Sequence, residues 1–241
     1  MHHFFVTDIQ SDQAEFSSEQ AHQIGRVLRL PVGARVVVLD NAGWQYEAEL
    51  VAVGRRVTAV LHHKQPAANE PASQITLFQA LLKRDNFEWV LQKGTEIGVT
   101  RFVPLITERA VAHPPNKSDR WQRILTEAAE QSRRGRIPEI APPLRLADAW
   151  QQAAAADIAL LPWEGTAAET IGTVLGTMFG GKRPSTIALF IGPEGGWTEA
   201  EVANGRAHNA IPVTLGPRIL RAETAAVVSA ALIMQFIGEW G

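Results

Sequence analysis

Cysteine is absent from the 241-residue chain, which excludes disulfide bonds, thiolate catalysis and cysteine-ligated zinc. The segment Met1 to Asp8 has neither the cationic start nor the long apolar stretch of a signal peptide. No apolar run is long enough to suggest a membrane span. The histidine pairs His2-His3 and His62-His63 have no third ligand at a suitable spacing. We therefore expect a cytoplasmic protein without a metal site.

Net charge is also small, at -2, but the charges are unevenly spread. Residues 71–145 carry 12 Lys and Arg against 8 Asp and Glu, whereas the segments on both sides are acidic. A nucleic acid needs cations at the place where it binds, not a basic chain as a whole. The composition is therefore compatible with an RNA ligand.

A polar, proline-bearing segment at 64–73 separates two different patterns. Before it, short strands at Arg35 to Leu39 and Tyr46 to Val53 are separated by turn residues, which predicts a small β-barrel over 1–70. A capping box of Ser17 and Gln20 opens one helix there. After it, strands alternate with helices, which predicts an α/β domain with a mostly parallel sheet over 71–241. The expected strands are 75–82, 102–106, 157–161, 186–191 and 211–215.

Two Gly-Pro steps directly follow two of these strands. Gly192, Gly195 and Gly196 leave the backbone bare, so that a ligand can approach its N–H and C=O groups. The spacing is neither that of a P-loop nor that of a dinucleotide fingerprint, and the loop carries Glu194 and no cation. Such a loop suits a nucleoside-like or cationic ligand, although a simple tight turn is the alternative.

The second step, Gly216-Pro217, leads into an apolar segment at 224–237 that predicts a buried helix. A third loop of similar character begins at Leu161-Pro162. Ligands of open parallel sheets lie beyond the carboxyl ends of the strands. The three loops are therefore expected at one edge of the sheet.

Four segments carry a resemblance to a known family: Lys83 to Val99, Glu127 to Ile140, Ile191 to Glu201 and Leu215 to Leu232. They resemble the bacterial 16S ribosomal RNA uracil-N3 methyltransferases, which belong to the SPOUT class of S-adenosylmethionine-dependent enzymes. The resemblance covers almost the whole chain. Ser132 departs from it, since many relatives have cysteine there. It implies a SPOUT domain with a trefoil knot, a PUA-like barrel that binds RNA, and a homodimer with the final helix as a candidate interface.

The resemblance also implies roles for single residues. Those expected to bind S-adenosylmethionine are Leu161, Pro162, Gly192, Gly195, Leu215, Gly216, Ile219, Leu220 and Thr224. Arg221 is the candidate for stabilising charge on the uracil, and Glu194 or Glu223 for accepting its proton. Both glutamates could instead be carboxylates stabilised at a helix N-terminus.

Cations expected to contact RNA are Arg26, Arg29, Lys83, Arg84, Lys93, Arg133, Arg134 and Arg136. Each has a simpler interpretation. Arg26 and Arg29 could be solvated on one helix face, Lys93 could pair with Glu96, and an arginine after residue 132 could stabilise a helix end.

The function predicted from the resemblance is methylation of N3 of one uridine in the small-subunit RNA. The alternatives are a SPOUT methyltransferase acting on another RNA or on a ribose 2′-hydroxyl, and a binding module without transfer activity. The residues alone do not separate these alternatives.

Overall fold

The structure, a computed structural model, describes residues 1–83, 85–110, 118–164 and 169–240. The chain forms two compact units. The first unit contains Met1–Glu70 and Thr126–Ile137, and the second contains Pro71–Leu125 and Pro138–Gly241. The end of helix α3 (Ser118–Gln131) thus lies with the first unit, a return of the chain that the sequence pattern does not indicate.

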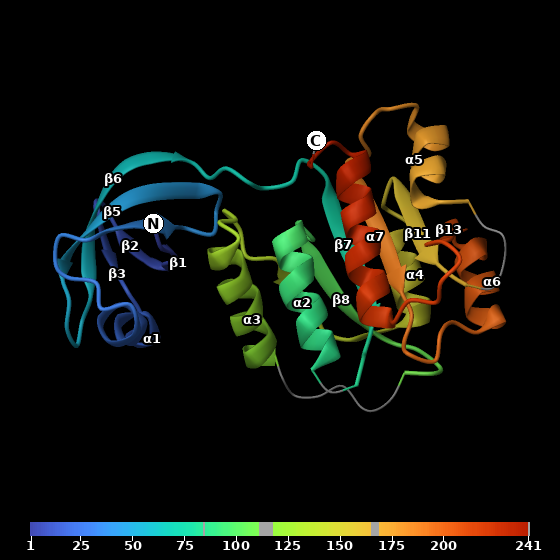
Figure 1. Cartoon of the computed structure of the whole chain (residues 1–241), viewed down its shortest axis with the longest axis horizontal. Helices are drawn as coiled ribbons and strands as arrows, with labels where there is room; N and C mark the ends of the chain where they lie inside the picture. Colours follow the sequence, from blue (N-terminus) through green and yellow to red (C-terminus); the bar gives the residue numbers. More distant parts are fainter. Residues whose placement is uncertain (84, 111–117, 165–168, 241) are drawn as a thin grey trace. The chain divides into compact units, whose positions relative to one another are not determined.

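A curled, mostly antiparallel sheet of six strands forms the first unit (Figure 1). The order is β1-β4-β5-β6-β3-β2, and the strands are β1 (His3–Phe5), β2 (Asp8–Gln10), β3 (Gln13–Glu15), β4 (Arg35–Leu39), β5 (Trp44–Ala52) and β6 (Thr58–Pro66). Alternate residues such as Val36, Val38 and Leu50 are fully buried in its core. Because β1 and β2 are not paired with each other, the sheet is a half-barrel. Strand β6 also runs three residues into the segment expected to be a linker.

One short helix, α1 (Ser18–His22), continues into a wider π-helical turn over Gln23–Val27. The expected capping box is confirmed, because Ser17 and Gln20 exchange hydrogen bonds of 3.1 and 3.2 Å. The expectation that Arg26 and Arg29 share a helix face is wrong. Arg29 follows the helical turns, with a left-handed φ of 52°, although both arginines are exposed.

Arg134 is buried, which corrects its expected role as a cation that contacts RNA. Only 3% of its side chain is exposed, and its Nη2 lies 2.8 Å from Glu70 Oε2. Glu70 Oε1 also accepts the backbone N–H groups of Gly135 and Arg136. The carboxylate therefore holds the turn that follows α3, and Arg134 neutralises that carboxylate.

A parallel sheet forms the second unit, as the alternating pattern predicts. Its order is β10-β8-β7-β12-β11-β13, with β9 beside β8. The strands are β7 (Gln74–Ala80), β8 (Arg101–Ile106), β9 (Glu139–Ile140), β10 (Leu144–Arg145), β11 (Ile158–Pro162), β12 (Thr186–Ile191) and β13 (Ala210–Val213). The two short strands β9 and β10 were not expected, because two residues give no periodicity to detect.

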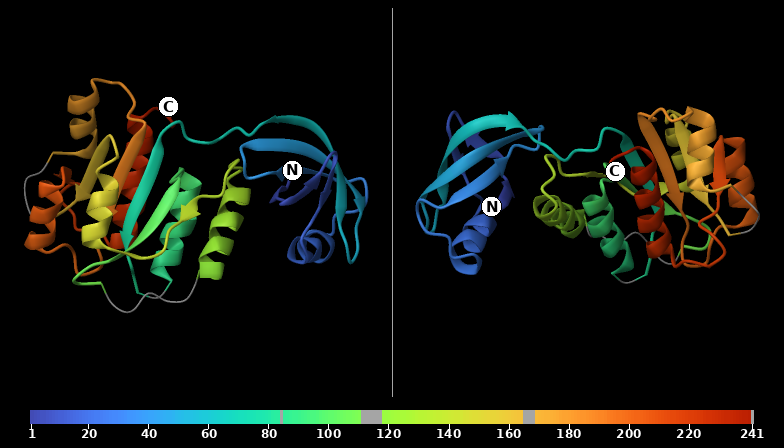
Figure 2. Two further views of the ribbon diagram at one scale, coloured as in Figure 1. Left: turned by 180° about the vertical axis from the view of Figure 1, so that it is seen from behind. Right: turned by 45° about the horizontal axis from the view of Figure 1, so that its top comes forward.

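Helices cover both faces of this sheet (Figures 1 and 2). On one face α2 (Asn86–Ile97) and α5 (Ile171–Phe179) pack against α7 (Ala222–Phe236), and on the other lie α4 (Leu146–Ala153) and α6 (Glu199–Ala207). Trp150 of α4 packs on Phe190 with ring centroids 3.9 Å apart. Gly98 ends α2 with a φ of 119°, and a Cβ there would lie 2.5 Å from Met234 of α7. Among the described residues, no helix is both long and apolar enough to cross a bilayer.

Glu130 near the end of α3 is a largely buried carboxyl group. Its Oε1 accepts the Phe5 N–H at 2.9 Å and so ties α3 to β1. Burial raises the pKa of Glu130 from 4.5 to about 7, against the opposing effect of the Phe5 hydrogen bond. The folded chain thus retains a proton that the unfolded chain releases. Its stability should fall as the pH rises from about 4.5 to about 7.

We expect Glu130→Gln to remove this pH dependence, because an amide oxygen still accepts the Phe5 N–H and carries no charge. Thermal melting at pH 5 and pH 8 measures the effect. The melting temperature of the variant should exceed that of the original chain at pH 8, and the difference should be smaller at pH 5. Asp119→Asn, an exposed change at the other end of the same helix, is the control and should leave the difference nearly unchanged. Equal shifts of Glu130→Gln at both pH values would contradict the assignment.

Candidate functional site

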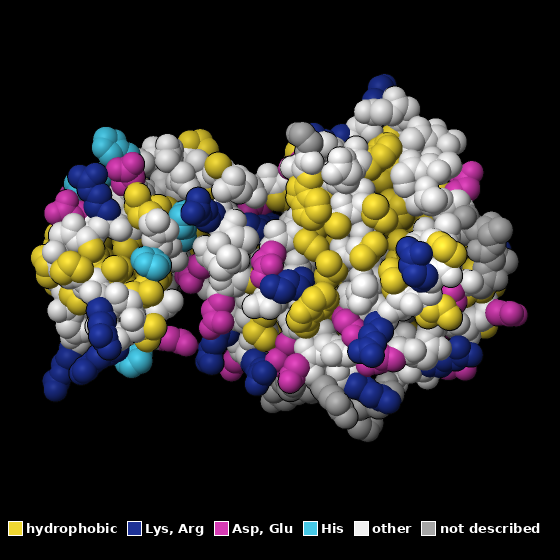
Figure 3. All heavy atoms as spheres, in the orientation of Figure 1, with side chains coloured by type: hydrophobic (Ala, Val, Ile, Leu, Met, Phe, Trp, Pro, Cys, Tyr) yellow, Lys and Arg dark blue, Asp and Glu magenta, His cyan; other side chains and the backbone are white. Residues whose placement is uncertain are grey.

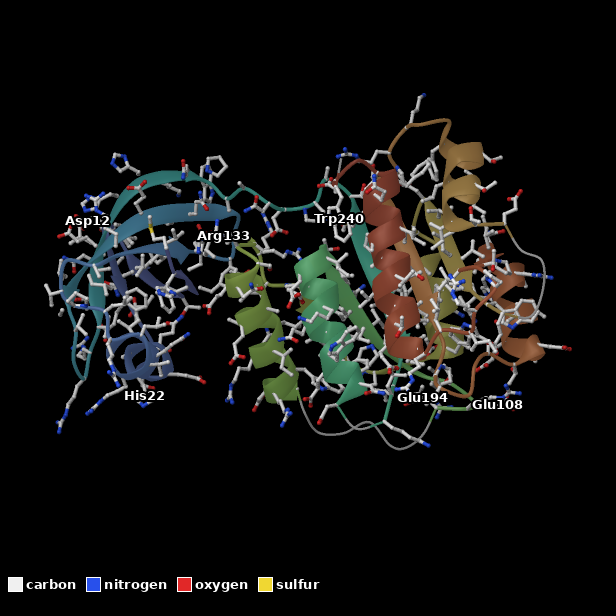
Figure 4. The ribbon with its side chains drawn as sticks, viewed as in Figure 1. Asp12, His22, Glu108, Arg133, Glu194 and Trp240 are labelled. Carbon is white, nitrogen blue, oxygen red and sulfur yellow. The ribbon has the colours of Figure 1, made fainter. Side chains whose placement is uncertain are left out.

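Three loops of the second unit enclose one cavity of about 200 Å³. They follow β11, β12 and β13, which are adjacent in the sheet in the order β12-β11-β13. All three strands are parallel, so their carboxyl ends meet at one edge. Glu194 and Glu108 mark this edge in Figure 4. The first turns of α7 complete the wall through Ala222 and Ala225.

Most residues predicted to bind a cofactor line this cavity: Pro162, Gly192, Gly195, Leu215, Gly216, Ile219 and Leu220. Leu161 and Thr224 are not among the described residues of the lining. Leu161 is fully buried and belongs to the core cluster around Trp150, because its side chain points into the sheet layer and not out of the loop. Thr224 lies half-buried on α7.

The cavity also contains residues that sequence reasoning missed. Trp163, Glu164, Trp197, Thr214 and Arg218 line it beside the predicted positions. Trp163 directly follows the predicted Pro162, and Trp197 directly follows the glycine loop. The sequence could have indicated both tryptophans because each is next to a loop predicted to bind the cofactor. However, loop residues show no periodicity from which the direction of a side chain can be predicted.

The glycine loop is held from both sides by side chains. A Cβ on Gly192 would lie 3.1 Å from the ring of Trp197, which is almost completely buried. On the other side, the side chain of Arg109 covers Gly195 and its Nη1 donates to the Gly195 carbonyl at 2.9 Å. Gly196 has a φ of 68°, where a larger residue would be strained. The backbone of this loop is therefore both bare and fixed in shape.

Glu201 joins two loops at the same edge. It forms a capping box with Thr198, through hydrogen bonds of 2.9 and 3.1 Å. Its Oε1 also accepts the Glu108 N–H at 3.1 Å, so the loop after β8 is attached to the start of α6. A single carboxylate thus positions both the glycine loop and the segment that carries Arg109.

The three candidate catalytic residues occupy different places. Glu194 lines the cavity, and its Oε1 accepts the Lys83 N–H at 2.8 Å. Arg221 is exposed at the N-cap of α7, and Glu223 lies in the first turn of that helix. Oε2 of Glu223 is buried and has no hydrogen-bond partner in the described part of the chain. Arg221 and Glu223 are not among the described residues that line the cavity.

The predicted RNA contacts are divided between the units. Arg26, Arg29, Arg133 and Arg136 are exposed on the first unit. In the second unit Lys83 is exposed, and Lys93 forms an ion pair of 2.8 Å with Glu96. Arg84 lies outside the described residues. Arg134 is not a free surface cation, for the reason given above.

Comparison with known proteins gives the family. Residues 68–234 match the model of the RNA methyltransferase domain. The ribosomal RNA small subunit methyltransferase E of Synechocystis is 40% identical over 90% of this chain and 71% of its own length. The chain belongs to the ribosomal RNA small subunit methyltransferase E family. The Bacillus subtilis member of this family is 29% identical over 90% of this chain and 88% of its own.

Solved structures agree with this membership of the methyltransferase E family. One is the ribosomal RNA small subunit methyltransferase E of Neisseria gonorrhoeae, bound to S-adenosyl methionine. It is 29% identical to this chain with a TM-score of 0.91, and the superposition covers 100% of both chains. A putative methyltransferase of Legionella pneumophila, in complex with the same cofactor, is 27% identical with a TM-score of 0.86, over 97% of this chain and 96% of its own.

Proposed function

We propose that this chain transfers a methyl group from S-adenosylmethionine to N3 of a specific uridine in the 16S RNA of the small ribosomal subunit. The observation that carries the proposal is the cavity with exposed backbone groups at the carboxyl ends of β11, β12 and β13, in a family with a member bound to this cofactor. A substrate of this kind places the reaction in the cytoplasm.

The lining of the cavity fits the chemistry of that cofactor. Bare backbone around Gly192 and Gly216 can bond the edge of an adenine, and the apolar side chains of Leu215 and Leu220 can cover its faces. Glu164 and Glu194 bring two carboxylates to the same lining, and opposite charge suits a sulfonium and an ammonium group. When bound, S-adenosylmethionine supplies an electrophilic methyl group.

The fold supports a finer proposal about the two units. We assign 71–241 to a SPOUT methyltransferase domain with a trefoil knot, and 1–70 to a PUA-like barrel that binds RNA. The parallel sheet with its cavity at the strand ends and the separate half-barrel support this division. The proposed contacts to RNA are Arg26, Arg29, Arg133 and Arg136 of the first unit and Lys83 and Lys93 of the second.

In the proposed reaction, uracil N3 loses its proton and forms a bond to the methyl carbon while the bond from that carbon to sulfur breaks. Arg221, exposed at the start of α7, stabilises the negative charge that develops on the uracil carbonyls. Glu194 or Glu223 accepts the proton. Each of these carboxylates has one oxygen without a hydrogen bond among the described residues.

The substrate proposal predicts where the methyl group is found. Unmodified small subunits and free ribosomal RNA are incubated with labelled cofactor, and the modified nucleotide is mapped by mass spectrometry. We expect label on N3 of a single uridine of the 16S RNA. Label on a ribose, on transfer RNA or on no RNA at all would overturn the assignment.

The mechanism predicts that Arg221→Ala lowers turnover far more than cofactor affinity. Loss of one charge-stabilising donor costs roughly a hundredfold or more in rate, while Arg221 does not line the described cavity. Single-turnover methylation gives the rate and calorimetric titration with S-adenosylmethionine gives the affinity. Lys182→Ala, at an exposed residue, is the control. Equal losses in rate and affinity would contradict the role.

We also propose that the enzyme is a homodimer with α7 in the interface. Leu232 is 45% exposed on α7, and hydrophobic side chains gather over α2 and α7 on this face of the second unit (Figure 3). A charge placed in such a patch opposes burial. We expect Leu232→Arg to shift the protein towards monomer in sedimentation equilibrium, with loss of methyl transfer. A chain that is monomeric before the change would contradict the proposal.

A further inference from the structure

Two aromatic rings, the exposed Trp44 and the half-buried Tyr46, and a cation form a cluster on the half-barrel. Trp44 opens β5 and is 40% exposed, and Tyr46 lies two residues further along the same face. Lys64 of β6 extends over both rings, with its Nζ 4.7 Å from the centroid of Trp44 and 5.5 Å from that of Tyr46. We call Trp44, Tyr46 and Lys64 the aromatic platform.

A β-bulge places the lysine on this platform. Gln45 pairs with Gln65 and Glu47 pairs with His62, so that β6 has one extra residue opposite Tyr46. Strict alternation from the buried Leu61 would put Lys64 on the opposite face. The extra residue returns it to the face of the rings. His63 takes a left-handed φ of 46° at this point, a conformation that non-glycine residues rarely adopt.

The charge of Lys64 is not neutralised by the described part of the chain, where it has no ion pair or hydrogen bond. The nearby Asp40 carboxylate accepts the N–H groups of Ala42 and Trp44 and serves the turn between β4 and β5. Arg136 adds a second cation at that turn, because its Nη2 donates to the Ala42 carbonyl at 2.8 Å. The platform therefore combines two aromatic rings with one cation that lies over their faces and a second at the neighbouring turn.

An aromatic ring with a neighbouring cation is suited to binding an unpaired nucleotide. Every nucleobase has a face that stacks on an aromatic ring, and a neighbouring cation attracts the phosphate. We propose that Trp44, Tyr46 and Lys64 form a subsite for one unpaired nucleotide of the RNA substrate. Its base stacks on the indole of Trp44, in the place that Lys64 Nζ occupies in the free chain, and Lys64 turns aside to pair with the phosphate. The inference rests on the proposed function, since it takes RNA as the substrate.

Fluorescence anisotropy with a labelled short oligouridylate, and with a duplex RNA of the same length, tests the subsite in the full chain. Base–aromatic stacking changes affinity by about 5- to 150-fold per base. We expect Trp44→Leu to weaken binding of the single strand within this range and to leave duplex binding nearly unchanged. Trp44→Phe keeps an aromatic face and should retain most of the affinity. Lys64→Gln should weaken binding and reduce its dependence on salt.

Trp240→Leu, at a tryptophan of similar exposure in the second unit, is the matched control and should have no effect. Thermal melting shows whether Trp44→Leu is folded. If it is not, the binding of Trp44→Phe and Lys64→Gln tests the subsite. The proposal is overturned if Trp44→Leu binds the oligouridylate as the original chain does, if Phe and Leu are equivalent, or if single strand and duplex lose equally. It is also overturned if the original chain does not bind the single strand.

Methyl transfer to unmodified small subunits separates this proposal from the proposed function. Trp44→Leu should raise KM for the RNA, with kcat and cofactor affinity nearly unchanged. If the original chain transfers the methyl group normally and Trp44→Leu changes nothing, the subsite is rejected and the proposed function stands. If the original chain transfers no methyl group to the RNA, the proposed function is rejected.

Discussion

The parallel arrangement of β12, β11 and β13 is the constraint on which the functional surface depends. Adjacent parallel strands end at the same edge of the sheet. The strand order therefore brings together loops that are separated in the sequence, before any contact between the loops is considered. The same arrangement places the N-termini of α6 and α7 there, because each helix follows one of these loops. The cavity is therefore a consequence of strand order, and its chemistry depends on which loop residues leave the backbone bare.

Bare backbone would be mobile unless other groups fixed it. In this structure Trp197 packs beneath Gly192, Arg109 covers Gly195, and Glu201 fastens the loop after β8 to the start of α6. Glu194 is tied in the same way to the backbone of Lys83. Several charged residues at this edge thus fix the shape of the loops, which favours a preformed pocket. Arg218 and Arg221 are exposed near the same loops.

The sequence predicted five of the seven strands of the parallel sheet to within a few residues, because these five have apolar runs long enough to recognise. It also located the capping box of Ser17 and Gln20 and most of the residues that line the cavity, since strand ends can be recognised and parallel strands share an edge. It misplaced Arg29 on a helix face and Arg134 on the surface for one physical reason. Which way a loop residue points, and whether a charge has a partner, depend on contacts with distant parts of the chain. Glu70 lies 64 residues from Arg134, and no local pattern indicates such a pair.

The first unit shows how this affects the search for an RNA surface. Arg133, Arg134 and Arg136 form a cluster in the sequence, yet one of them is buried to hold a turn and another donates to the backbone of a neighbouring turn. In contrast, Trp44, Tyr46 and Lys64 are dispersed in the sequence and are brought together by strand pairing and one extra residue. A left-handed non-glycine residue such as His63 costs about 1 kcal/mol or more. The strained residue lies where Lys64 is turned over the exposed ring of Trp44 and the half-buried ring of Tyr46. Because a cation over an exposed ring gains only a weak interaction, this geometry supports the proposed nucleotide subsite.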